Sequence, residues 1–287
     1  MKKTFLRIGI ALAVLAVMLA GVYGYVSREA ERLPGNNPAA FRAGHVARPG
    51  WKVVVCAGDS LTHGTVSVNY VDILSARFPE GPYVFVNAGV NSSLAYNLKT
   101  RLDAIVRCDP DFVAILIGTN DANATLSDRN ARRLVRKMHL PRTPDREWFK
   151  SNLTEVCAAL KDRTHARIAL LSLPPIGEEP DSDAFRRAEE YSAVIREVAA
   201  SQRVAYLPLN EAMSAEIRRH GKAPSLSYRG DTNPALYRAL AERVFLRRSF
   251  DEISRENGFL FLVDLLHLNT RGATRVADFV EAFITRP

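Results

Sequence analysis

The chain has 287 residues, of which 47% are hydrophobic and 24% are charged, so it can bury a core in one large domain or two small ones. Its formal net charge is +8, but the basic residues occur singly or in pairs, as at Arg132-Arg133. We find no long Lys/Arg run with aromatic residues interleaved. The charge is therefore read as a solvated basic surface, and we expect no nucleic-acid partner.

Residues 1–26 have the pattern of an export segment. Three basic residues precede an uncharged run from 8 to 26, and about 19 residues at a rise of 1.5 Å come close to spanning a bilayer core. The candidate cleavage site after Gly24 is poor, which favours an uncleaved signal anchor over a cleaved signal peptide. The positive-inside rule then predicts an exported protein, anchored by an N-terminal transmembrane helix and facing the periplasm or exterior, or secreted if the signal is cleaved.

Residues 27–50 contain Pro-Gly-Asn-Asn-Pro at 34–38 and are predicted as a tether. From residue 51 to residue 287, short apolar runs alternate with longer amphipathic segments. The predicted strands are 52–57, 83–87, 111–117, 167–173 and 204–207. The predicted helices are 69–78, 94–106, 148–163, 184–201, 210–219, 234–257 and 270–285. This alternation predicts an α/β fold with a mostly parallel, doubly wound sheet covered on both faces, in three layers.

Ser60, Gly89 and Asn120 each lie in a polar, glycine-containing loop that follows a predicted strand. The carboxyl ends of parallel strands emerge at one edge of a sheet, so we expect these three residues to lie together. The polar, basic segment 127–146 is predicted as an excursion or lid. Each residue alone also fits an ordinary role, Ser60 as a helix cap and the other two as turn residues.

Asp264 and His267 stand three residues apart near the C-terminus, between an apolar run and the last helix. On one turn, the carboxylate can hold one imidazole nitrogen and leave the other free to take a proton from a serine hydroxyl. Asp-x-x-His alone is a weak signal, since such pairs are common on surfaces. Its occurrence together with Ser60, Gly89 and Asn120 favours a catalytic site.

The three cysteines lack any spacing typical of a metal or redox site. Cys56 lies in an apolar strand and is predicted as an inert core thiol. A disulfide between Cys108 and Cys157 requires an oxidising compartment, and the sequence leaves that pairing open. We expect no metal and no cofactor.

In these motifs the chain resembles the SGNH hydrolases, also called GDSL esterases or lipases. The four matching blocks are Gly58-Asp59-Ser60-Leu61, Asn87-Ala88-Gly89, Gly118-Thr119-Asn120-Asp121 and Asp264-Leu265-Leu266-His267. Their order and spacing agree over residues 52–285. One departure is Ser92, which stands where related proteins often have a second glycine, three residues after Gly89.

The resemblance implies a flavodoxin-like SGNH fold and a Ser-His-Asp mechanism. Ser60 is the implied nucleophile, His267 the base, and Asp264 the residue that orients His267. The oxyanion hole is implied to consist of the N–H groups of Ser60 and Gly89 and the amide of Asn120.

The sequence thus predicts an extracytoplasmic serine ester hydrolase in a catalytic domain over 51–287, removing acyl groups from a glycan or lipid. The segments 127–146 and 221–233 are expected to shape its cleft. An O-acyltransferase would use the same residues, and a non-catalytic surface binding module of the same fold is a third hypothesis. The acyl group, the substrate and the oligomeric state stay open at this point.

Overall fold

The structure is a computed structural model that describes residues 21, 24, 28, 32–44, 50–220 and 222–286. The chain divides into two compact units, Met1–Leu33 and Pro34–Pro287. The second unit contains the β-sheet.

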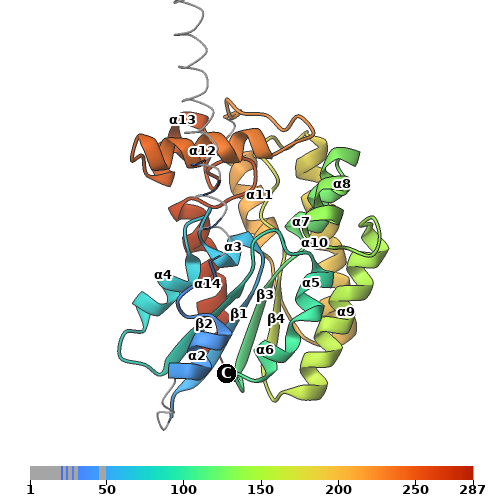
Figure 1. Cartoon of the computed structure of the whole chain (residues 1–287), viewed down its shortest axis with the longest axis vertical. Helices are drawn as coiled ribbons and strands as arrows, with labels where there is room; N and C mark the ends of the chain where they lie inside the picture. Colours follow the sequence, from blue (N-terminus) through green and yellow to red (C-terminus); the bar gives the residue numbers. More distant parts are fainter. Residues whose placement is uncertain are drawn as a thin grey trace, which may run out of the picture. The chain divides into compact units, whose positions relative to one another are not determined.

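Five parallel strands form the sheet of this unit, in the order β2-β1-β3-β4-β5 (Figure 1). Their bounds are β1 Lys52–Gly58, β2 Tyr83–Gly89, β3 Phe112–Leu116, β4 Arg167–Leu171 and β5 Ala205–Leu207. The strands fall where the apolar runs predict them, because residues buried on both faces of a parallel sheet are almost all apolar. Gly58 pairs in register with Gly89 and with Leu116, which brings the carboxyl ends of β1, β2 and β3 side by side.

Helices cover both faces of this sheet, so the predicted doubly wound α/β architecture is confirmed (Figure 1). In the first half of the described chain the helices are α2 Pro38–Gly44, α3 Ser60–His63, α4 Tyr70–Arg77, α5 Ala95–Thr100, α6 Leu102–Val106, α7 Thr119–Ala124 and α8 Asp128–Lys137. In the second half they are α9 Arg146–Arg163, α10 Asp183–Gln202, α11 Leu209–His220, α12 Asn233–Phe245, α13 Phe250–Asn257 and α14 Thr270–Thr285.

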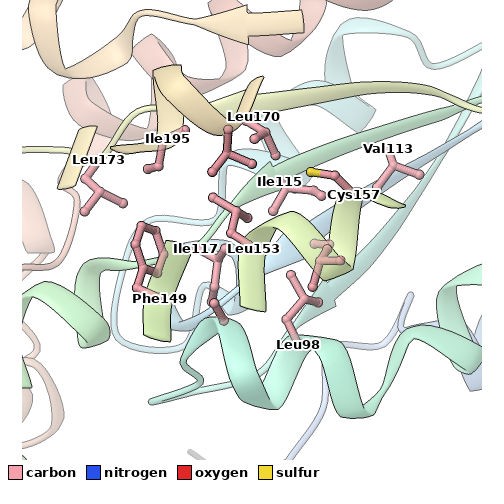
Figure 2. Close-up of a cluster of buried hydrophobic side chains, with 14 of the residues drawn as sticks. Leu98, Val113, Ile115, Ile117, Phe149, Leu153, Cys157, Leu170, Leu173 and Ile195 are labelled. Carbon is pink, nitrogen blue, oxygen red and sulfur yellow. The ribbon is translucent and has the colours of Figure 1, made fainter. Parts of the chain in front are cut away.

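The sheet separates two hydrophobic cores. One core packs alternate residues of the strands, such as Val113 and Ile115, against α5, α6, α9 and α10, with Phe149 and Leu153 in its interior (Figure 2). The other core packs the opposite residues, such as Val54 and Cys56, against α4, α11 and α14. Successive side chains of a strand point to opposite faces, so one buried strand serves both cores.

Two predicted helices are broken in the structure. The predicted helix 94–106 is two helices, α5 and α6, which meet at Arg101, where φ is −117°. The predicted helix 234–257 is also two, α12 and α13, and α13 starts afresh at a capping box made by Ser249 and Glu252. The segment 127–146, predicted as a polar excursion, contains the helix α8.

Part of the predicted tether packs on the domain. Asn36 donates a side-chain hydrogen bond to the Phe85 carbonyl at 3.3 Å and accepts one on its own carbonyl from the Asn87 N–H at 3.0 Å. Phe41 on α2 contacts the first core. Pro34–Gly44 is therefore bound to the domain next to β2.

The predicted anchor or signal, residues 1–26, lies outside the described residues except for Gly21 and Gly24. Among the residues that the structure describes, no helix combines the length and the hydropathy needed to cross a membrane. The three cysteines, all described, are buried free thiols, and burial raises the pKa of Cys56 and of Cys157 to about 12.

Candidate active site

Ser60 is the first residue of α3, directly beyond the carboxyl end of β1. The turn between strand and helix requires glycine at position 58, because a Cβ there would lie 2.2 Å from Thr62 Oγ1 and 2.3 Å from the Leu116 carbonyl oxygen. Asp59 caps the helix by accepting the Leu61 N–H at 3.0 Å. These contacts hold Ser60 at the edge of the sheet, with 9% of the residue exposed.

Two hydrogen bonds connect Ser60 to His267 and His267 to Asp264. Ser60 Oγ lies 3.0 Å from His267 Nε2, although the two residues are 207 positions apart. His267 Nδ1 lies 2.8 Å from Asp264 Oδ2. The other carboxylate oxygen, Asp264 Oδ1, accepts the N–H groups of Leu266 at 2.7 Å and His267 at 2.8 Å. The one-turn geometry inferred from the Asp-x-x-His spacing is therefore present.

The electrostatic interactions among these three residues favour an ionised Asp264 and a more basic His267. Burial raises the pKa of Asp264, but His267 and the bound N–H groups outweigh it, so its pKa lies below the usual value. Burial lowers the pKa of His267, but the Asp264 carboxylate outweighs it and the net direction is upward. An ionised Asp264 thus places the imidazole proton on Nδ1 and leaves Nε2 free to accept the Ser60 proton.

Asn120 lies at the start of α7, at the same edge of the sheet, and only 8% of it is exposed. Its Nδ2 donates to the Ser93 carbonyl at 3.1 Å, which ties α7 to the loop after β2. An amide group carries two N–H donors, so this bond uses one of them.

Gly89 does not offer the free N–H that the sequence analysis assigned to it. Its N–H donates to Asn87 Oδ1 at 3.0 Å, while Asn87 Nδ2 donates to the Thr62 carbonyl at 2.7 Å. A Cβ on Gly89 would lie 2.2 Å from the His63 nitrogen. Glycine is thus required here because β2 and α3 approach closely. The N–H that the sequence predicts as an oxyanion donor is bound to Asn87 Oδ1 in this structure.

Arg101 is a half-buried residue near the site that the sequence analysis missed. Its guanidinium donates to the carbonyl oxygens of Ala88 and Gly58, each at 2.7 Å, and so joins the carboxyl ends of β2 and β1. Burial lowers its pKa to about 10, and the charge of Asp59 opposes that shift. A signal was available, because Arg101 lies three residues after Leu98 and four before Ile105, on the apolar face of the predicted helix.

Two further carboxyl groups, those of Asp59 and Asp121, are buried near the carboxyl ends of the strands. Burial raises the pKa of Asp59 to about 6 and that of Asp121 to about 7, in both cases against hydrogen bonds from backbone N–H groups. Asp121 Oδ2 accepts the Ala95 N–H at 3.1 Å. Among the described residues, no group of three or more His, Cys, Asp or Glu side chains is arranged to hold a metal ion.

Replacing Asp121 by asparagine is expected to stabilise the fold more at pH 8 than at pH 5. The raised folded-state pKa means that the stability contribution of Asp121 is full below pH 3.8 and is lost as the pH rises towards 7. A neutral amide keeps an acceptor for the Ala95 N–H and avoids that loss, by about 1–3 kcal/mol between the two pH values. Urea denaturation at both pH values measures the difference. The exposed Asp162→Asn is the control, and an equal effect of Asp121→Asn at both pH values would contradict the expectation.

The two segments predicted to shape the cleft contact each other. Ser127 Oγ donates to the Gly230 carbonyl at 2.7 Å. The Tyr228 hydroxyl lies 3.0 Å from Asn123 Oδ1 and accepts from Asn130 Nδ2 at 2.9 Å. Through Asn123 this contact reaches α7, the helix that carries Asn120.

Fold and site together define the class of protein. Residues 56–275 match the model of the GDSL-like lipase/acylhydrolase family, and the chain belongs to that family. It is accordingly a carboxylic ester hydrolase, as the resemblance noted in the sequence predicts.

Solved structures share this fold. An acetylxylan esterase from Geobacillus stearothermophilus, Axe2, aligns with a TM-score of 0.58 at 16% identity, covering 84% of this chain and 98% of that one, in a catalytic-mutant form. The acetyl xylan esterase AlAXEase aligns with a TM-score of 0.56 at 20% identity over 81% and 99%. LAE5, an alpha/beta hydrolase from the metagenome of Lake Arreo, Spain, aligns with a TM-score of 0.55 at 19% identity over 80% and 94%. A search of curated protein sequences gives no significant match.

Proposed function

We propose that this protein is a serine esterase that removes acyl groups, in the first place acetyl groups, from an acylated glycan. The observation that carries the proposal is the chain of contacts Ser60–His267–Asp264, at 3.0 and 2.8 Å, at the carboxyl edge of a parallel sheet. Similarity in fold to two acetylxylan esterases supports a glycan ester as the substrate.

In the proposed mechanism Ser60 Oγ attacks the acyl carbonyl carbon while His267 Nε2 takes the hydroxyl proton. The tetrahedral intermediate collapses, and the imidazolium returns that proton to the sugar oxygen as the alcohol leaves. Water then attacks the acyl-enzyme with His267 again as base, and the carboxylic acid and free Ser60 are released. Asp264 keeps the imidazole oriented and stabilises its charged form in both steps.

The oxyanion of each intermediate needs donors that are fixed before the reaction. We assign this role to the backbone N–H of Ser60 and to the second amide N–H of Asn120. The first turn of a helix has N–H groups without intrahelical acceptors, which suits Ser60 to the task. Gly89 is left out of the proposed oxyanion hole because its N–H is held by Asn87.

Replacing Asn120 by alanine is expected to lower kcat by about 10²–10³-fold with little change in KM, because the lost donor acts on charge that develops in the transition state. Steady-state hydrolysis of p-nitrophenyl acetate measures both constants. Asn152→Ala is the matched control, since among the described residues that amide donates to the Trp148 carbonyl within α9 and to no group of the site. A kcat within threefold of the wild type would remove Asn120 from the oxyanion hole.

The substrate class is tested by product analysis. Purified protein is incubated in parallel with acetylated xylooligosaccharides and with a lysophospholipid, and the released acetate or fatty acid is quantified. Acetate release is expected, whereas fatty-acid release alone would overturn the glycan assignment. With excess xylooligosaccharide as acceptor, transfer of the acetyl group in place of acetate release would indicate the O-acyltransferase.

We further propose that the enzyme acts outside the cytoplasm, on the basis of the predicted export segment at residues 1–26. Fractionation of cells that express the full chain tests this proposal. Protease sensitivity of the catalytic domain in spheroplasts is expected, and complete protection would contradict it.

A further inference from the structure

Glu178 is a buried carboxylate outside the catalytic residues described so far. It lies in the loop between β4 and α10 and is 4% exposed. Its Oε2 accepts the N–H of Leu260 at 2.6 Å, and its Oε1 accepts the N–H groups of Phe261 and Leu262 at 2.7 and 2.9 Å. Three consecutive backbone N–H groups therefore converge on one side chain 82 or more residues away.

The segment that Glu178 holds leads directly into the catalytic loop. After Leu262 the chain forms a loop that contains Asp264 and His267. Two backbone hydrogen bonds close this loop: the Val263 N–H donates to the His267 carbonyl at 2.7 Å, and the Asn269 N–H donates to the Phe261 carbonyl at 2.9 Å. Asp264 and His267 thus lie within a short closed loop. Glu178 holds the segment of that loop that precedes Asp264, residues 260–262.

A second contact comes from the same side of the domain. The N–H of Gly177, next to Glu178, donates to the Leu265 carbonyl at 2.8 Å, in the middle of the catalytic loop. The loop after β4 therefore holds the catalytic loop at two points, before Asp264 and between Asp264 and His267. A carboxylate suits the first point because both its oxygens accept hydrogen bonds, whereas an amide would present N–H donors to backbone N–H groups.

We infer that Glu178 is a positioning residue for the hydrolysis reaction, which holds the loop of Asp264 and His267 so that His267 Nε2 meets the Ser60 hydroxyl. The inference rests on the proposed function, in which His267 is the base. A misplacement of the order of 1 Å in such a group costs about 10²-fold in rate. Glu178 touches no reacting atom, so its effect is on the geometry of His267.

The test compares Glu178→Gln with Glu179→Gln, the same change at the adjacent carboxylate, which accepts from Ser227 Oγ and makes no bond to the catalytic loop. Glu178→Gln is expected to lower kcat for p-nitrophenyl acetate by about 10–100-fold with KM within twofold. It should slow labelling of Ser60 by a serine-directed phosphonate in parallel. The low-field proton NMR signal of the His267 Nδ1–H bonded to Asp264 should shift or disappear. Glu179→Gln should match the wild type in all three measurements.

A wild-type kcat and an unshifted low-field signal in folded Glu178→Gln would overturn the inference. If Glu178→Gln is not folded, as shown by the absence of a cooperative unfolding transition, Glu178→Asp is measured instead. Aspartate keeps the carboxylate, but its side chain is one methylene too short to reach all three N–H groups. An unchanged kcat and signal in that variant would likewise overturn it. If the wild type neither hydrolyses esters nor reacts with the phosphonate, the proposed function fails, while the NMR comparison still tests whether Glu178 positions His267.

Discussion

Replacing Ser60 by alanine is expected to lower kcat for p-nitrophenyl acetate and for acetylated xylooligosaccharide by about 10⁴–10⁶-fold. Alanine removes the Ser60 hydroxyl, whose oxygen lies 3.0 Å from His267 Nε2. Without this hydroxyl no acyl-enzyme can form. What remains is catalysis by the oxyanion donors and by substrate binding, which is a small part of the total. Initial rates at saturating substrate, with mass spectrometry of phosphonate-treated protein, measure the loss of activity and of the labelled serine.

Ser75→Ala is the matched control for this variant. The Ser75 hydroxyl donates to the Val71 carbonyl within α4 and has no contact with the site, so its removal should leave kcat within twofold of the wild type. Full activity of Ser60→Ala would overturn the nucleophile assignment. No hydrolysis and no phosphonate labelling in the wild type, with glycan binding unchanged in Ser60→Ala, would instead favour the non-catalytic binding module.

Replacing Asp264 by asparagine is the second large effect that we expect, with kcat lowered by about 10³–10⁴-fold. The asparagine side chain no longer fixes the proton on His267 Nδ1, so the tautomer with a free Nε2 is no longer selected. The backbone conformation of the loop should be unchanged, because the asparagine oxygen can still accept the N–H groups of Leu266 and His267, as Asp264 Oδ1 does.

The pH dependence of the same variant has a defined sign. In the wild type the Asp264 carboxylate raises the pKa of His267, so activity is lost as the pH falls through that raised value. Without the carboxylate, burial of the imidazole lowers its pKa, and the acid limb of the residual activity should move to lower pH. Asp111→Asn is the control, since that carboxylate accepts the Val53 N–H at the opposite edge of the sheet. An acid limb that stays in place would remove Asp264 from the electrostatics of the site.

The sequence by itself determined the parallel α/β sheet, the positions of Ser60 and Asn120 beyond the carboxyl ends of its strands, and the one-turn pairing of Asp264 with His267. These follow from local information: apolar runs define buried strands, a parallel sheet places all carboxyl ends together, and Asp-x-x-His is a one-turn geometry.

Only the tertiary structure decided what the supporting residues do. Gly89 matches a family motif, yet its N–H is held by Asn87 and its missing Cβ is needed for packing against His63. Arg101 and Glu178 act through backbone carbonyls and N–H groups that lie from 13 to 84 positions away in the chain. The sequence pattern carries hydrophobic periods and short motifs, whereas the partner of a buried polar group depends on which distant segments the folded chain brings into contact.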